Sequence, residues 1–232
     1  MDAKTELELE STPPEEKGSI EITLDNGEVL VLPTIKINKK KLYHGSTVSG
    51  ITEILEAEED TVGKGVYLTS EPMWASGYAM VRSSNPQNRI VYETEVENLT
   101  LIDLTNQRET LPILGKLMVQ EIRKFENKTA NSEDIKAPLK WAISHNASEI
   151  YKMVRENKLR APRDLLFHFG ALATNKLKGL GLDGIKAIEG GEGGNNIKIG
   201  DHDTYVIFDP QKVKVIQESQ MLPYQHEEVK VA

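Results

Sequence analysis

The stretch that decides the fold reads Lys41-Leu42-Tyr43-His44-Gly45-Ser46. It predicts a short strand over 42–44 whose end is open to a ligand, because a glycine lets another group approach the backbone N–H and C=O. A second stretch, Gly63-Lys64-Gly65-Val66-Tyr67-Leu68-Thr69-Ser70, predicts a strand over 65–69 that leads directly into a helix over 71–82. The two stretches are candidate walls of one site.

Around these stretches the hydrophobic pattern predicts an α+β fold. Further strands are expected over 89–96, 99–103, 184–188, 204–209 and 213–217. Further helices are expected over 51–57, 109–126, 133–144, 148–157 and 163–177. The strands on both sides of this helical middle are expected to share a core, because neither group alone could cover its faces.

The two ends of the chain differ from its middle. Residues 1–18 are acidic and contain Pro13-Pro14, which predicts a disordered tail. Residues 19–40 are predicted to form a β-hairpin extension, because Asn26-Gly27 lies between two short apolar runs. The main domain is expected over 41–217, with a helical insertion at about 107–180, and residues 218–232 form a polar C-terminal tail.

The composition excludes several classes of site. The 232 residues include no cysteine, so disulfides, thiolate zinc sites and cysteine nucleophiles are excluded. No run approaches the roughly 18 apolar residues of a membrane span, and the first residues do not resemble a signal peptide. Asp201-His202-Asp203 is the nearest approach to a metal site, but adjacent ligands rarely point at one ion. We therefore expect a cytoplasmic protein with no metal and no membrane contact.

Charge is distributed unevenly along the chain. Residues 107–190 carry 15 Lys+Arg and 10 Asp+Glu, a surplus of +5, whereas the rest carries 13 and 26, or −13, which sums to the net −8. A basic segment in an acidic chain suits the recruitment of a macromolecular acceptor, either protein or nucleic acid. Solvated helix faces would give the same pattern.

Three motifs, taken in order, resemble the ADP-ribosyltransferases of the diphtheria-toxin and poly(ADP-ribose)-polymerase branch. That branch has His-Gly on its first core strand, then Gly-x-Gly-[Ile/Val]-Tyr-[Phe/Leu] before a helix, and finally an acid–Tyr–Val–Val–Tyr/Phe–Asp–Pro strand. The corresponding segments here are residues 43–46, 63–69 and Thr204-Tyr205-Val206-Ile207-Phe208-Asp209-Pro210. Residues 89–96 and 182–185 are also similar to the small bacterial and phage members, including the rifampin-modifying enzymes.

The resemblance covers about 42–104 and 180–217, and it implies a split antiparallel β-sheet core with a helical insertion. It implies a mono-ADP-ribosyltransferase that uses NAD as substrate. It also implies a toxin or effector, acting in the cytoplasm of the producer or of a target cell, with an antitoxin as a further partner.

The resemblance also assigns roles to residues. His44 binds the adenosine ribose, Gly45 holds the nicotinamide amide, and Tyr67 and Tyr78 sandwich the nicotinamide ring. The full expected NAD-binding set is His44, Gly45, Ser46, Tyr67, Thr69, Ser70 and Tyr78. The expected catalytic set is His44, Tyr67, Thr204 and Asp203.

The sequence departs from the family at the third motif. The polymerases carry a glutamate where this chain has Thr204, with Asp203 before it, and strand alternation prevents both side chains from entering one pocket. The loss argues against chain elongation. It leaves mono-ADP-ribosylation, weak NAD turnover, or a catalytically inactive NAD- or ADP-ribose-binding module that acts through its helical insertion. Glu93, Glu95 or Asp201 could supply the missing acid, or they could simply be surface residues of an edge strand.

Two further readings remain. The run Glu189-Gly190-Gly191-Glu192-Gly193-Gly194-Asn195-Asn196 lacks the Lys-Ser/Thr of a P-loop and predicts a mobile loop beside the last strands, of a kind that often closes over a site. An RNA 2′-phosphotransferase would share the fold and the His-Gly start. That family needs arginines in its pocket, and the arginines near the motifs are Arg82 and Arg89.

Overall fold

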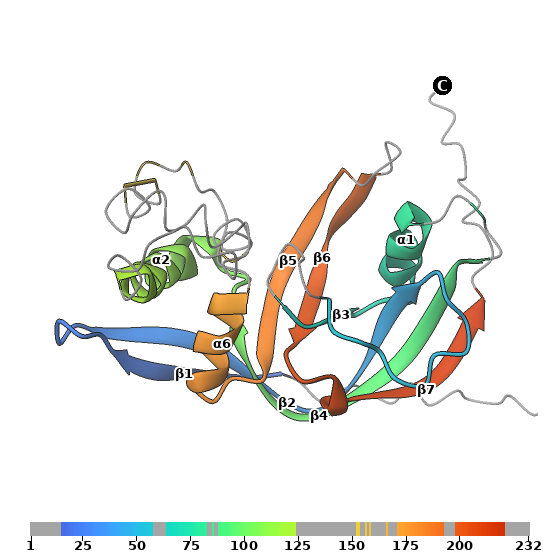
Figure 1. Cartoon of the computed structure of the whole chain (residues 1–232), viewed down its shortest axis with the longest axis horizontal. Helices are drawn as coiled ribbons and strands as arrows, with labels where there is room; N and C mark the ends of the chain where they lie inside the picture. Colours follow the sequence, from blue (N-terminus) through green and yellow to red (C-terminus); the bar gives the residue numbers. More distant parts are fainter. Residues whose placement is uncertain are drawn as a thin grey trace, which may run out of the picture.

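The computed structural model describes residues 15–57, 64–82, 85, 88–123, 152–153, 156, 158, 166, 171–192 and 198–220. Figure 1 shows an α+β fold dominated by its sheet. The strands are β1 Glu16–Thr23, β2 Val29–Ser46, β3 Val66–Thr69, β4 Ile90–Asp103, β5 Gly184–Glu192, β6 Lys198–Ile207 and β7 Val213–Gln220. The helices are α1 Pro72–Arg82, α2 Gln107–Arg123 and α6 Ala171–Gly179, with a 3-10 turn at Pro210–Lys212.

Five of the strands close into a ring, in the order β2, β3, β6, β5, β4 and back to β2. The β2–β4 ladder runs antiparallel from Thr34↔Ile102 to Ser46↔Ile90, whereas β2 and β3 share the single pair Tyr43↔Thr69. The expected α+β class with a sheet core is confirmed. The expectation of an antiparallel core needs one correction, because β4 and β5 pair in parallel over residues 101–103 of β4.

The predicted breaks in the sheet fall within continuous strands. Two strands were expected over 89–96 and 99–103, but residues 90–103 form the single strand β4, with Asn98 at φ 52° inside it. Asparagine tolerates this left-handed conformation better than most residues. The conformation shifts the alternation of side chains by one: Tyr92 and Val96 before it lie in the same apolar cluster as Leu99 and Leu101 after it.

The hairpin around Asn26-Gly27 is confirmed, with Gly27 at φ 82° and β1 paired to β2 from Thr23↔Val29. The expected boundary at residue 40 falls inside β2, which runs from the hairpin into the strand that carries His44. Residues 16–18 and 218–220, expected in the two tails, belong to β1 and β7. The rest of the tails, 1–14 and 221–232, lies outside the described residues.

The helix predictions have three outcomes. The helices expected over 71–82 and 109–126 correspond to α1 and α2, and the end of the one expected over 163–177 lies in α6. The helix expected over 51–57 is wrong: this segment is irregular, and Leu55 on it is 78% exposed. The helix expected over 133–144 and most of that over 148–157 lie outside the described residues. No helix in the described part is long and apolar enough to cross a membrane.

Apolar side chains form two clusters on opposite faces of the sheet. The helix cluster joins the β1–β2 hairpin to α2 and α6 and includes Leu32, Leu114 and Phe208. The second cluster, which we call the ring cluster, includes Leu42 and Leu68. Val206 belongs to the helix cluster and its neighbour Ile207 to the ring cluster, as strand alternation requires. Figure 1 shows α2 and α6 together on one side of the molecule and α1 beside β2 and β3.

A network of charged side chains ties the start of β1 to the ring. The Glu15 carboxylate accepts hydrogen bonds from Lys186 Nζ at 2.7 Å, from Tyr205 Oη at 2.7 Å and from Lys40 Nζ. These partners lie on β5, β6 and β2. Burial raises the pKa of Glu15, but the hydrogen bonds from Lys186, Lys40 and Tyr205 outweigh it and lower the pKa from 4.5 to about 2. Glu15 therefore contributes to stability as a carboxylate.

We predict that Glu15→Gln lowers the free energy of unfolding by about 1–3 kcal/mol at pH 7, between the values for exposed and buried ion pairs. Because folding lowers the pKa of Glu15, its contribution is fully present above pH 4.5 and is lost as the pH falls toward 2. Urea unfolding at pH 7 and pH 3 measures both effects. Glu21→Gln, at an exposed position of β1, is the control. Equal stability of wild type and Glu15→Gln at pH 7 would contradict the prediction.

Candidate functional site

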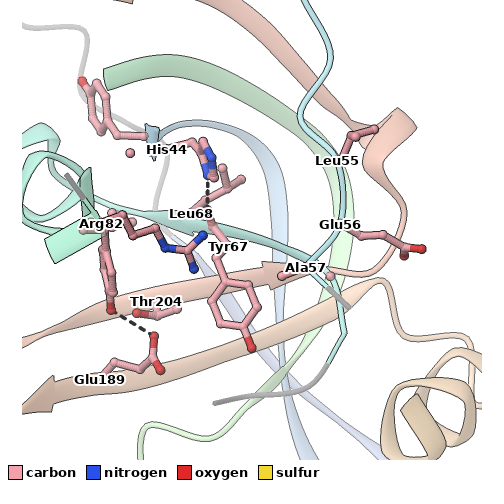
Figure 2. Close-up of a pocket in the computed structure, with 14 residues that line it drawn as sticks. His44, Leu55, Glu56, Ala57, Tyr67, Leu68, Arg82, Glu189 and Thr204 are labelled. Carbon is pink, nitrogen blue, oxygen red and sulfur yellow. Dashed lines mark hydrogen bonds between the residues drawn. The ribbon is translucent and has the colours of Figure 1, made fainter. Parts of the chain in front are cut away.

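A pocket of about 250 Å³ lies where the end of β2 meets β3, α1, β5 and β6 (Figure 2). Its walls come from these five elements and from the segment before β3. The lining residues are Tyr43, His44, Gly45, Leu55, Glu56, Ala57, Gly65, Tyr67, Leu68, Thr69, Tyr78, Arg82, Glu189 and Thr204.

The structure brings together six of the residues that the sequence nominated. These are His44, Gly45, Tyr67, Thr69, Tyr78 and Thr204. Ser46, Ser70 and Asp203 do not line the pocket. The Asp203 carboxylate instead lies 3.0 Å from Lys186 Nζ, in the network around Glu15, so Asp203 and Thr204 point to opposite faces of β6.

His44 is held in one orientation by the strand that faces it. Its Nδ1 lies 2.9 Å from the carbonyl oxygen of Tyr67. A carbonyl oxygen only accepts hydrogen bonds, so Nδ1 carries the proton and donates, which leaves Nε2 as an acceptor. Burial lowers the pKa of His44 below 6.5 and the charge of Arg82 lowers it further, whereas the bond to Tyr67 raises it. The imidazole is therefore neutral at pH 7.

Arg82 is the cationic side chain among the described lining residues. It ends α1, and Figure 2 shows its guanidinium extending into the pocket. Two carboxylates, Glu56 and Glu189, lie on the same lining, and Glu56 pairs with Lys64 at 2.7 Å. The pocket thus combines both signs of charge with tyrosine rings and a neutral imidazole.

We predict that Arg82→Ala raises the pKa of His44 but leaves it below 6.5, because the charge is removed while the burial remains. An NMR titration of the imidazole C–H resonances measures the shift. Arg108→Ala, which removes an exposed charge on α2, is the control and should leave the pKa of His44 unchanged. A lower pKa in Arg82→Ala would contradict the assignment.

Gly45 is required by the packing of α1. A Cβ at this position would lie 1.9 Å from the carbonyl oxygen of Ala75 and 3.1 Å from the backbone nitrogen of Ala79. Both atoms belong to the α1 backbone, which cannot move without displacing the helix. The sequence suggested that Gly45 leaves room for a ligand. The structure shows that α1 itself occupies this space and already requires a glycine.

We predict that Gly45→Ala destabilises the protein by about 1–3 kcal/mol, as overpacking does in well-packed interiors. Gly179→Ala is the matched control, because a Cβ there meets nothing within 4 Å. Thermal unfolding of both variants compares them directly. A Gly45→Ala variant that melts with the wild type would show that α1 can shift at little cost.

Glu189 is a lining residue that sequence reasoning missed. The run from 189 to 196 was expected to be a loop, but β5 continues to Glu192, while 193–197 lie outside the described residues. Glu189 is 6% exposed, and its Oε2 lies 3.2 Å from Tyr78 Oη. The period of two along Ile185, Ala187 and Glu189 is the signal that could have found it, because all three are buried.

His202 packs against Trp74 and Tyr78, beside Glu189. Its ring stacks on Trp74, with centroids 4.9 Å apart and planes at 17°, and its Nε2 lies 3.1 Å from Tyr78 Oη. Asp201 and Asp203 flank it on a strand and therefore point to the other face. No group of three metal-ligating side chains is found within the described residues.

No protein-family model matches the chain, and no curated protein matches it. Among solved structures, the chain is similar to one in the crystal structure of the M. tuberculosis MbcT–MbcA toxin–antitoxin complex. The two are 10% identical, with a TM-score of 0.41, over 82% of this chain and 87% of that chain. A likeness at this level defines neither a fold nor a function.

Proposed function

We propose that the protein is a mono-ADP-ribosyltransferase that transfers ADP-ribose from NAD to a macromolecular acceptor. The observation that supports this most is the lining of one pocket by His44, Tyr67 and Tyr78, which lie on β2, β3 and α1. The resemblance to the ADP-ribosyltransferases implies that these three side chains bind the two halves of one dinucleotide. Such an assignment requires that they share a pocket.

The chemistry of the lining suits NAD. His44 Nε2 is an acceptor that can bind a ribose hydroxyl, and tyrosine faces attract a flat cationic ring such as nicotinamide. The guanidinium of Arg82 matches a diphosphate. A volume of about 250 Å³ lies just below the range usual for sites of drug-sized ligands, so we expect part of the dinucleotide to extend beyond the pocket.

The proposed reaction breaks the C–N bond between nicotinamide and ribose. The electron pair leaves with the ring nitrogen as neutral nicotinamide, and positive charge develops on the ribose, as in glycoside hydrolysis. A nucleophilic atom of the acceptor bonds to the same carbon and loses its proton. With water as acceptor, the products are nicotinamide, ADP-ribose and a proton.

The acceptor remains a protein or a nucleic acid, recruited by the basic segment 107–190. Several cations of this segment are already paired within the fold: Lys116 with Glu28, Lys176 with Glu121 at 2.9 Å, and Lys186 with Glu15 at 2.7 Å. In this proposal the acceptor is therefore bound by cations of the segment other than these three. The toxin or effector role, the cytoplasmic site of action and an antitoxin partner rest on the sequence resemblance.

A catalytically inactive NAD- or ADP-ribose-binding module is the second candidate. It is favoured by Thr204, which lines the pocket at the third motif and carries no charge to stabilise a cationic ribose. The two candidates differ in turnover, because a module binds NAD without releasing nicotinamide.

We predict that the wild-type protein releases nicotinamide from NAD over time, and that His44→Ala and Tyr67→Ala each lower kcat/KM by about 10- to 1000-fold through lost orientation of the dinucleotide. Chromatography of the reaction measures release. Glu21→Gln is the control. Mass spectrometry of protein and nucleic acid from cells that express each variant identifies the acceptor. Binding of NAD without release would favour the module, and absence of both would contradict the proposal.

A further inference from the structure

A buried carboxylate enters the pocket from the strand beside Thr204. Glu189 of β5 pairs in register with His202 of β6, and Ala187 pairs with Thr204. Side chains of directly paired residues lie on the same face of a sheet, and so do residues two apart along a strand. Glu189, His202 and Thr204 therefore share the pocket face. Thr204, the uncharged residue of the third motif, therefore has the Glu189 carboxylate near it on the neighbouring strand.

Three ring side chains hold Glu189 in place. Tyr78 Oη lies 3.2 Å from Glu189 Oε2 and 3.1 Å from His202 Nε2, and His202 stacks on Trp74. A hydroxyl has one proton, so Tyr78 donates to the carboxylate and accepts from the Nε2–H of His202. The Thr204 hydroxyl lies 3.4 Å from the same Nε2. This arrangement fixes the direction in which the carboxylate points.

The acids that the sequence offered as replacements for the missing glutamate do not line the pocket. Glu93 pairs with Lys41 and Glu95 with Lys39, each at 2.9 Å, and neither lines the pocket. Asp201 is exposed and is not a lining residue either. Glu189 is consequently the buried acid of the described lining.

We propose that Glu189 is a catalytic residue whose carboxylate stabilises the positive charge that develops on the ribose as the nicotinamide bond breaks. This inference rests on the proposed transferase function. Glu189 is 6% exposed, and a fixed charge on a buried side chain stabilises an opposite charge more than it would in bulk solvent. The carboxylate also accepts the proton that the attacking nucleophile loses and then releases it to solvent, so the step balances with no further reactant.

The test is Glu189→Gln, which keeps the shape of the side chain and an acceptor for Tyr78 but removes the charge. We expect kcat for nicotinamide release to fall about 100- to 1000-fold, as when a transition-state stabiliser is removed. We expect the Kd for NAD to change by less than about threefold, because the charge acts on the transition state rather than on the bound substrate. Glu21→Gln, which removes an exposed carboxylate of β1, is the matched control for kcat and Kd.

The outcomes separate this inference from the proposed function. Wild-type turnover together with a Glu189→Gln variant that keeps more than a third of the wild-type kcat would overturn the role of Glu189 and leave the transferase standing. A wild type that releases no nicotinamide would overturn the transferase and, with it, this role. Thermal unfolding shows whether Glu189→Gln is folded. If that variant is unfolded, Glu189→Asp decides: a lowered kcat with an unchanged Kd supports the role, and the wild-type kcat overturns it.

Discussion

The pocket depends on one hydrogen bond between β2 and β3, the neighbouring strands of the ring that share the fewest paired residues. β2 and β3 share the single pair Tyr43↔Thr69, so the ladder itself does little to hold the two strands together. The His44 imidazole connects the same two strands and donates to the Tyr67 carbonyl oxygen at 2.9 Å. That bond fixes the tautomer of His44 and links β2 to β3, whereas the ladder with β6 over residues 66–69 sets the path of β3 and so places Tyr67. β2 and β3 can separate to form the pocket because the His44 side chain takes the place of the backbone hydrogen bonds that the two strands lack.

The local sequence was sufficient to predict the elements that carry strong signals. Asn26-Gly27 marks the hairpin, and the glycines before Tyr67 mark a strand that leads into α1. Predictions failed where tertiary structure decided. The spacing of Ile51, Ile54 and Leu55 resembles a helix, yet Ile54 is buried and Leu55 is exposed on an irregular segment. Asn98 suggested the end of a strand. Instead β4 continues through it, and the side chains after Asn98 alternate in the opposite sense to those before it.

The sequence could predict those site residues that belong to a motif on one strand. His44, Tyr67 and Thr204 could be nominated because each lies in a motif read along one strand. Glu189 could not, because its importance comes from the register between β5 and β6, which sequence position does not reveal. The same register separates Asp203 from Thr204 and assigns Asp203 to the Glu15 network. Pairing between strands, more than residue type, decides which acid reaches the pocket.

Closure of the ring also determines which backbone remains open to other molecules. Within the described residues, β1 and β7 are the outer strands, since each has one partner strand. An unpaired strand margin can template the addition of a foreign strand, and charged side chains discourage this. β1 exposes Glu16, Lys17 and Glu21, and β7 exposes Lys214 and Glu218. The two outer strands thus carry the kind of charge that keeps an exposed sheet edge from pairing with another chain.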